Sequence, residues 1–527
     1  MSDAVIVIEG STALLTGAVT KPLQDLLRPL DPDRRYNLAF REKRWDGRVD
    51  LFEGRRFPAG LVNRVQGWFI DRRRPCAIKG SPDHYWRVDM SAFKPDILPG
   101  ITLYDHQMRA CMAALQQQRG VIKSPTGSGK SEMTAALAKF FYEQRGWTSL
   151  VMVPKKGLAK QTVARFRGYF KDNISVGQCG DGQKTIGAVT VATVQTLVGY
   201  QNRSVKGRVK LADPALAKLI RTVDVLFLDE THHASAYTWF DIAMAAKQAR
   251  RRYGLSGTPL KADELADLRM EGATGPIICE IPATQLIDNG LAARPKIVMV
   301  MAENASEPEL PPVPAFKPEN RAKGKMRPMP YPDAYKAGII ESVKHNTAVV
   351  RATAWMTDQR RRTVIICRRL DHFAVLQKML DERGIRYGAA YGGTETQERD
   401  RLKALLKSKQ IDVILATTIF DEGEDVPSIE AIILAEGVKV STNALQRVGR
   451  GMRRKKGEND VWIVDFVPLC HPTLTKHAQL RCEAYEAEGY EVQIVETWPH
   501  PDVTEYDEAS LLPFKAWEQA YAATAGA

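Results

Sequence analysis

A glycine- and serine-rich segment, SPTGSGKS at 124–131, lies between the apolar run GVIKS and an alanine-rich stretch. Glycines let backbone N–H groups turn toward a phosphate, the lysine reaches the outer phosphates of a nucleotide, and the last hydroxyl ligates Mg²⁺. The segment departs from the phosphate-loop pattern only at Ser124, and the alternative is a turn that happens to carry a lysine. We therefore expect nucleotide contacts from Thr126, Gly127, Ser128, Gly129, Lys130 and Ser131, with Ser131 also on the metal.

Two adjacent carboxylates, Asp229 and Glu230, close the apolar run VDVLFL. A buried strand delivers its carboxyl end to the rim of a parallel sheet, where ligands bind. We expect Asp229 to hold Mg²⁺ and Glu230 to orient and activate an attacking water. An acidic pair is often only a solvated feature, so its place after a strand and downstream of a phosphate loop carries the prediction.

These side chains need a scaffold, and two groups of short apolar runs alternate with amphipathic segments. Such alternation predicts an α/β fold in which helices cover both faces of a parallel sheet. The runs are GVIKS, SLVMVP, AVTVAT, VDVLFLDE and RYGLSGTP in the first group, and RTVIICR, YGAAYGG, VILATT, AIILAE and VWIVDF in the second.

A chain of 527 residues is expected to hold about three domains. Residues 1–95 open with a β-rich run and continue with many arginines, which predicts a small α+β module that contacts nucleic acid. The two α/β units are expected at 100–300 and 336–468. Proline, lysine and glutamate dominate 301–335, which predicts a linker or insertion, and 469–527 reads as a helical C-terminal extension.

The composition restricts the class of protein. Lys and Arg number 75 against 62 Asp and Glu, a net charge of +13, which favours a polyanionic partner. No apolar run is long enough to cross a bilayer, and no secretory signal is readable at the N-terminus. Seven scattered cysteines without a CxxC pair argue against a zinc site or a disulfide framework. We expect a cytoplasmic protein with reduced thiols and no membrane partner.

A series of segments resembles the motifs of superfamily 2 helicases and translocases, whose motor consists of two RecA-like domains. The series is LYDHQ (103–107), SPTGSGKS, VPKKGLAKQ (153–161), VATVQT (191–196), DETH, SGTP (256–259), ATTIFDEGEDVP (416–427) and QRVGRGMR (446–453). Each motif alone is weak, whereas the ordered set is specific and covers about 100–466. The resemblance implies a nucleic-acid-dependent ATP hydrolase with Mg²⁺, in which two RecA-like sheets follow the N-terminal module.

The resemblance also implies roles for individual residues. Nucleotide contacts are expected from Tyr104, Gln107, Gly423 and Asp425. Besides Glu230, catalytic roles are expected from Lys130, Gln446, Arg450 and Arg453. An arginine fork suits the charge of a transferring phosphate. Ser256 and Thr258 match the motif that couples the ATP site to the nucleic-acid path. Contacts to the nucleic-acid backbone are expected from Lys155, Lys156, Thr193, Gln195 and Thr417.

The N-terminal segment REKRWDGRVDLFEGRRF resembles the segment that precedes the motor of phage recombination helicases. From Arg34 to Arg74 the chain carries twelve Lys and Arg against five Asp and Glu. Arginines with aromatic residues between them suit phosphate contact and base stacking, so we expect nucleic-acid contacts from Arg44, Trp45 and Arg48. The alternative is a small core of Trp45 and Phe40 with Leu51 and Phe52, surrounded by solvated arginines.

The function that these resemblances imply is an ATP-dependent DNA helicase or translocase that remodels forks, junctions and R-loops in recombination, repair or replication. Its partners would be single-stranded, duplex or branched DNA, with RNA–DNA hybrid as a further substrate, in a bacterial or phage-infected cell. The alternatives are an RNA helicase, the motor subunit of a restriction or repair nuclease, and a scaffold protein with an inactive ATPase fold.

Overall fold

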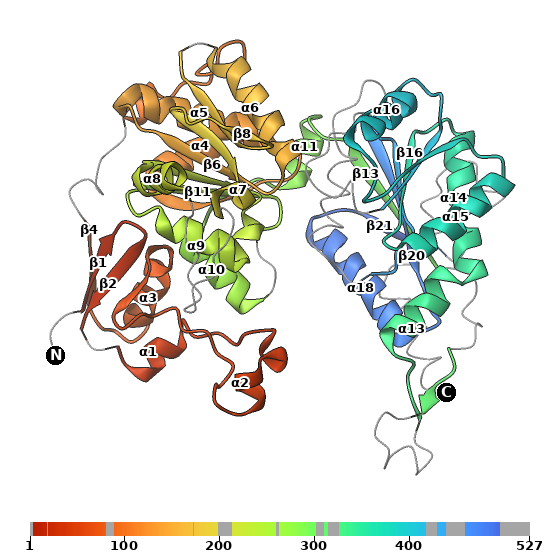
Figure 1. Cartoon of the computed structure of the whole chain (residues 1–527), viewed down its shortest axis with the longest axis horizontal. Helices are drawn as coiled ribbons and strands as arrows, with labels where there is room; N and C mark the ends of the chain where they lie inside the picture. Colours follow the sequence, from red (N-terminus) through yellow and green to blue (C-terminus); the bar gives the residue numbers. More distant parts are fainter. Residues whose placement is uncertain are drawn as a thin grey trace. The chain divides into compact units, whose positions relative to one another are not determined.

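The computed structural model describes residues 4–17, 19–80, 89–171, 173–198, 213–259, 263–301, 310–314, 326–417, 429–438 and 459–495. Internal contacts divide the chain into two compact units, Met1–Ile281 and Pro282–Ala527. Each unit is described by itself, and Figure 1 gives the labels of its elements.

The first unit begins with a small module built on a four-stranded mixed sheet of order β3-β2-β1-β4. Its buried side chains come from the sheet and from one face of a helix that places Val62, Val65 and Phe69 inward. Leu268 from a later helix completes this core, and Arg64 pairs with Glu271 of the same helix at 2.6 Å. The elements are β1 (Ala4–Glu9), β2 (Thr12–Thr16), α1 (Lys21–Asp25), α2 (Leu38–Arg41), β3 (Arg56–Pro58), α3 (Val62–Ile70) and β4 (Cys76–Gly80).

An eight-stranded sheet of order β12-β5-β11-β10-β6-β9-β7-β8 forms the rest of this unit, and only the last pair is antiparallel. Its strands are β5 (Arg119–Lys123), β6 (Ser149–Val153), β7 (Val176–Gly180), β8 (Gln183–Lys184), β9 (Val189–Thr193), β10 (Val225–Asp229), β11 (Arg251–Ser256) and β12 (Ile277–Glu280). Its helices are α4 (Asp105–Gln116), α5 (Lys130–Arg145), α6 (Lys156–Phe170), α7 (Val194–Val198), α8 (Pro214–Thr222), α9 (Tyr237–Ala245) and α10 (Glu264–Thr274).

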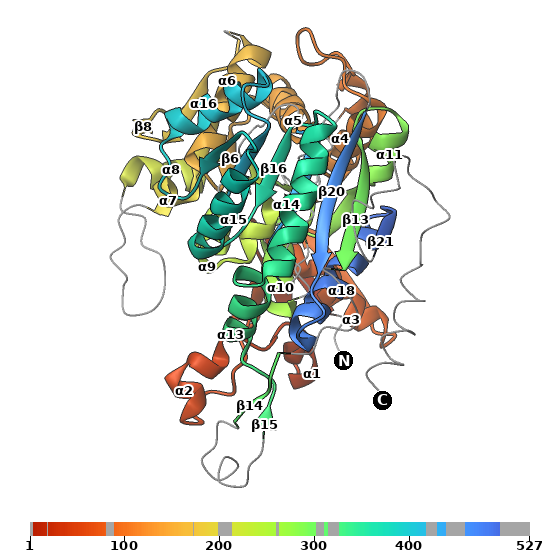
Figure 2. The same cartoon turned by 90° about the vertical axis from the view of Figure 1, so that its right-hand side faces the viewer.

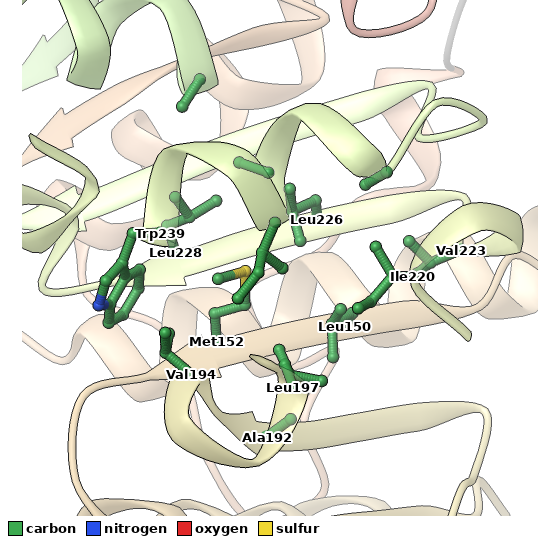
Figure 3. Packing of buried hydrophobic residues seen from close by; sticks show 14 of the residues in the cluster. Leu150, Met152, Ala192, Val194, Leu197, Ile220, Val223, Leu226, Leu228 and Trp239 are labelled. Atoms are coloured by element: carbon green, nitrogen blue, oxygen red, sulfur yellow. The ribbon is translucent and has the colours of Figure 1, made fainter. Parts of the chain in front are cut away.

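Both faces of this sheet are covered, which explains why its central strands β6, β9 and β10 are buried along almost their whole length. On one face, side chains of β6 and β10 pack against α7, α8 and α9, as Figure 3 shows for Leu150, Leu226, Leu197, Ile220 and Trp239. On the other face, aromatic rings of α5 stack on the sheet, and the centroids of Phe141 and Tyr253 are 6.4 Å apart.

The second unit is a seven-stranded sheet of order β17-β18-β16-β19-β20-β13-β21, with all its pairs parallel. Helices α14 and α15 pack on one face of it (Figure 2). A buried ion pair, Arg481–Asp465 at 2.7 Å, joins α18 to β20. The main elements are α11 (Ala283–Asp288), β13 (Arg294–Met301), α13 (Tyr331–Tyr335), α14 (Val343–Asp358), β16 (Thr363–Ile366), α15 (Leu370–Glu382), β17 (Tyr387–Ala390), α16 (Thr396–Lys407), β18 (Val413–Ala416), β19 (Ala431–Leu434), β20 (Asp460–Val467), α18 (Pro472–Ala487) and β21 (Val492–Val495). A short antiparallel pair joins β14 (Val313–Pro314) and β15 (Met326–Arg327).

The predicted fold class is confirmed: two parallel α/β sheets follow a small mixed sheet. The ranges of the units differ from those expected. Residues 294–300, expected in the first unit, and Met301, expected in the linker, form β13 inside the second sheet, between β20 and β21. Residues 492–495, expected in a helical extension, form the edge strand β21 of the same sheet.

Candidate nucleotide-binding site

The sheet order of the first unit brings the predicted segments together at one edge. The phosphate loop follows β5, SGTP follows β11, and DETH follows β10, and these three strands are neighbours. The segments with Lys155 and Gln195 follow β6 and β9, the next two strands. All five strands are parallel, so their carboxyl ends meet at the same edge, where ligands bind in such sheets.

The phosphate loop has the backbone that a cradle for phosphate requires. Gly127 and Gly129 both have φ of +85°, a conformation that favours glycine. Gly129 is the N-cap of the sixteen-residue helix α5, so free N–H groups and the positive end of the helix dipole point toward the loop. The departure at Ser124 is accommodated inside the loop, because its buried hydroxyl lies in hydrogen-bond contact with that of Ser128.

Side chains in the first turn of α4 form hydrogen bonds with the phosphate loop. The side-chain amide of Gln107 donates to the Ser128 carbonyl at 3.1 Å, and its oxygen accepts from the Tyr104 N–H at 2.9 Å. The ring of His106 also hydrogen-bonds the Ser128 carbonyl, at 3.0 Å, and burial lowers its pKa, so the ring is neutral at pH 7. The fit is close, since a Cβ at Gly129 would lie 1.9 Å from the Gln107 nitrogen. The half-exposed Tyr104 ring stacks on His106 with centroids 5.7 Å apart, which leaves an aromatic face for a base.

The two carboxylates lie beside the loop lysine. The Lys130 ammonium is 3.5 Å from a Glu230 oxygen and donates to the Ser124 carbonyl at 3.4 Å. Desolvation and the neighbouring charge of Glu230 raise the pKa of Asp229 well above its ordinary value, while Lys130 opposes this shift. Glu230 has φ of +52°, a strained conformation for a residue with a side chain and one that is common at functional sites.

These residues fit Mg²⁺ bound with a nucleotide. A cation next to Asp229 would relieve the carboxylate repulsion that raises its pKa, and the Ser131 hydroxyl in the first turn of α5 supplies a second oxygen ligand. Oxygen ligands from one carboxylate and one hydroxyl, completed by substrate phosphates, are typical of Mg²⁺. When bound, Mg²⁺ would neutralise phosphate charge; Asp229 and Ser131 would hold it.

The SGTP segment is linked to the phosphate loop by a backbone hydrogen bond. The Ser124 N–H donates to the Ser256 carbonyl at 2.9 Å, which joins the two segments directly. The Thr258 N–H donates to the Ser256 hydroxyl at 3.2 Å, and the buried Thr258 hydroxyl has no hydrogen-bond partner among the described residues. The coupling role expected for the segment stays a prediction.

The residues expected on the nucleic-acid backbone occupy the other end of the same edge. Lys155 and Gln195 are exposed, and the Gln195 amide donates to the Pro154 carbonyl at 3.3 Å, which ties the two segments together. Thr193 differs, because its side chain is buried and its hydroxyl lies 2.9 Å from that of Thr196. In the second unit Thr417 follows β18 and is nearly buried.

Sequence reasoning missed two residues of α6 that face the phosphate loop. The Arg165 guanidinium donates to the Ser131 hydroxyl at 3.4 Å, and the Tyr169 hydroxyl donates to Glu132 at 2.6 Å. The i, i+4 spacing of Arg165 and Tyr169 places both on one helix face, but nothing in the local sequence shows what that face meets. Helix α6 begins at Lys156, directly after Lys155. The same helix therefore runs from the segment expected to contact the nucleic-acid backbone to the first turn of α5.

In the N-terminal module, the tryptophan and the second arginine of the segment RWDGR form hydrogen bonds with backbone carbonyls of the module itself. The Trp45 indole N–H donates to the Arg48 carbonyl at 2.8 Å, and the Arg48 guanidinium donates to the Arg28 carbonyl at 2.9 Å. Arg44 is exposed and pairs with Glu42. The alternative prediction, a small core built by these four side chains, is confirmed in part. Leu51 and Phe52 are buried, whereas Phe40 and Trp45 are half-buried.

Five predicted site residues lie outside the described residues: Gly423, Asp425, Gln446, Arg450 and Arg453. All seven cysteines are free. The parts of the chain that the structure describes contain no helix with both the length and the apolar composition needed to span a bilayer.

Two protein families match the chain. Residues 100–261 match the family described as type III restriction enzyme, res subunit, and 344–455 match the helicase conserved C-terminal domain. The ATP-dependent DNA helicase uvsW of Enterobacteria phage T4 is 21% identical over 454 residues, which cover 82% of this chain and 84% of that protein. The DNA 3'-5' translocase XPB2 of Sulfurisphaera tokodaii is 23% identical over 386 residues, covering 69% and 81%.

A solved structure with a TM-score above 0.5 shares the fold of this chain. Saccharomyces cerevisiae Dbp5 bound to RNA and ADP BeF3 matches with a TM-score of 0.51 at 15% identity, over 76% of this chain and 91% of that one. The crystal structure of T4 UvsW matches with a TM-score of 0.45 at 20% identity, over 94% and 100%.

Proposed function

The chain belongs to the superfamily 2 helicases, as a distant homologue of T4 UvsW over most of its length, and on this premise we propose that it is an ATP-dependent DNA helicase or translocase that remodels branched DNA. The observation that carries the proposal is the shared sheet edge. The segments expected to bind the nucleotide follow three neighbouring β-strands. The segments expected to contact the nucleic-acid backbone follow the next two β-strands of the sheet. In this proposal, one sheet edge would support both the ATP site and the nucleic-acid path.

The residues of the first unit suit ATP binding and hydrolysis. Loop N–H groups and Lys130 would hold the phosphates, Tyr104 would offer a stacking face to the base, and Asp229 with Ser131 would hold Mg²⁺. Glu230 would orient the attacking water and accept its proton. The hydrogen bond between Ser124 and Ser256 would pass the change at the phosphates to the SGTP segment.

DNA is favoured as the polymer because the relatives matched over most of their own length are named as a DNA helicase and a DNA translocase. Backbone contacts such as those expected from Lys155 and Gln195 carry little base information, so binding should not depend on sequence. Forks, junctions and R-loops are proposed as substrates by analogy with the phage relative. A role in recombination or repair follows the same analogy.

A second candidate is the motor subunit of a nuclease complex, which the type III restriction match over 100–261 favours. In that case DNA cleavage would need a partner, and a nuclease subunit should co-purify with the chain from its host.

A strand-displacement panel tests the proposed function. Full-length protein is given labelled fork, four-way junction, R-loop and RNA-duplex substrates, with ATP and with a non-hydrolysable analogue. We expect ATP-dependent unwinding of the branched DNA substrates and little activity on the RNA duplex. Preference for the RNA duplex would replace DNA with RNA as the substrate.

A further inference from the structure

Helix α2 of the N-terminal module, labelled in Figure 1, borders an open hollow of about 600 Å³. The side chains that line it include four cations and two aromatic rings: Arg35, Arg41, Lys43, Arg44, Phe40 and Trp45. The hollow is distant in sequence from every segment of the ATP site, and the function proposed above does not explain its shape.

The hollow carries a net positive charge that its own surroundings do not neutralise. Arg35, Arg41 and Lys43 are exposed and make no ion pair with any described residue. Arg44 pairs with Glu42, and the carboxylate of Asp46 pairs with Arg28 at 2.9 Å. Three cations are thus left to meet an anionic ligand.

The floor of the hollow is aromatic. Phe40 and Trp45 are both half-buried and meet edge to face, with ring centroids 6.3 Å apart. A purely electrostatic surface needs no such rings. Partly accessible aromatic faces between cations are the arrangement that stacks an unpaired base and holds its phosphates.

The floor is also fixed in place. The indole N–H is held by the Arg48 carbonyl at 2.8 Å, and Arg48 is anchored on the Arg28 carbonyl at 2.9 Å. Gly47, with φ of +79°, lies against the Phe40 ring, and a Cβ there would be 2.8 Å from a ring carbon. The tight turn therefore holds both rings, and Arg48 is a positioning residue rather than a contact. Pre-organised aromatic groups lose little entropy when a ligand stacks on them.

We propose that this hollow binds an unpaired nucleotide of a single strand, with its base stacked on Trp45 and Phe40 and its phosphates near Arg41 and Lys43. In an intact duplex both faces of each base are already stacked, so a duplex offers this floor only its ends. The proposal rests on the proposed function, in which such a strand is displaced from branched DNA, and it names the part of the substrate that the module recognises.

The test is a binding assay with full-length, nucleotide-free protein. Fluorescence anisotropy compares a labelled single-stranded oligonucleotide, the same length with abasic sites, and the corresponding duplex. Trp45→Ala should weaken binding of the intact strand about tenfold, whereas Trp45→Phe should retain most of it. Neither variant should change binding of the abasic strand. Equal loss on intact and abasic strands would overturn base stacking.

Charge reversal keeps the test valid if Trp45→Ala does not fold. Arg41→Glu and Lys43→Glu should weaken the intact and abasic strands alike, and more at low salt. The matched control is Arg55→Glu, the same change on an exposed side chain of the same module that does not line the hollow. An effect of Arg55→Glu as large as that of Arg41→Glu would show a general charge effect and refute the hollow as a site.

Two further measurements distinguish a failure of this inference from a failure of the proposed function. An RNA strand of the same sequence distinguishes the two polymers that offer unpaired bases. Stimulation of wild-type ATP hydrolysis by DNA is measured separately. If DNA stimulates hydrolysis but Trp45 and Arg41 variants bind single strands normally, only the hollow is refuted. If DNA does not stimulate hydrolysis, the proposed function fails whatever the hollow binds.

Discussion

Replacing Glu230 by Gln separates catalysis from nucleotide binding. The change keeps the size of the side chain and removes one charge. Glu230 is the expected general base, a role worth about 10²–10⁴ in rate. Its loss should therefore slow hydrolysis by that factor, which corresponds to about 3–5 kcal/mol in the activation barrier.

The same change should not weaken nucleotide binding, for a reason visible in the structure. The Glu230 carboxylate lies 3.5 Å from the Lys130 ammonium and raises the pKa of Asp229. Without it, Lys130 loses a competitor to the phosphates, and Asp229 loses a repelling neighbour. Both side chains of the Lys130–Glu230 pair are partly exposed, so solvent reduces the gain. We expect affinity for Mg²⁺-nucleotide that is equal to wild type or a few-fold tighter.

Single-turnover hydrolysis measures the first effect, and titration with a fluorescent nucleotide measures the second. Glu280→Gln is the matched control: it removes a charge at the same sheet edge, where Glu280 pairs with Lys123 at 2.7 Å. The control should leave both quantities unchanged. Normal hydrolysis by Glu230→Gln would remove this residue from catalysis, and a parallel loss of binding would make it a structural anchor of Lys130.

Three further changes test the packing that supports the site and the second unit. Gly129→Ala should destabilise the nucleotide-free protein more than Gly127→Ala, because both have φ of +85° but only the former places a Cβ against Gln107; equal shifts in melting temperature would contradict this. Arg481→Met should cost about 3–5 kcal/mol in urea unfolding, because it leaves a buried aspartate without its partner, and a small effect would show that water reaches the pair. Burial lowers the pKa of His345 to about 4, so the unfolded chain takes up a proton between pH 6.5 and 4 that the folded chain does not. Wild type should lose about 3 kcal/mol relative to His345→Gln over this interval, and parallel pH profiles would refute the buried neutral ring.

The sequence predicts the centre of each sheet well. In the first sheet, β5, β6, β9, β10 and β11 are largely buried because helices cover both faces, and a motif follows each. Two strands near one margin of the second sheet, β13 and β21, were missed. β13 and β21 belong to the second sheet, and β13 pairs with β20, which lies more than a hundred residues later. Local patterns carry no information about such distant partners.

The site shows the same limit. Motif spacing identified Lys130 and Glu230, and the structure brings them within 3.5 Å. Motif spacing did not identify Arg165, because the contact of this residue with Ser131 depends on how α6 packs on α5. Nor did motif spacing show that the guanidinium of Arg48, which stays a predicted nucleic-acid contact, donates to the carbonyl of Arg28. Such tertiary contacts follow from packing and not from residue type.

The most direct measurement of the central claim is the rate of ATP hydrolysis by the full-length protein during titration with single-stranded, duplex and branched DNA and with RNA. If one sheet edge serves both the nucleotide and the strand, hydrolysis should rise with added DNA and saturate, and rise less with RNA. A rate that does not respond to any polynucleotide would contradict the claim.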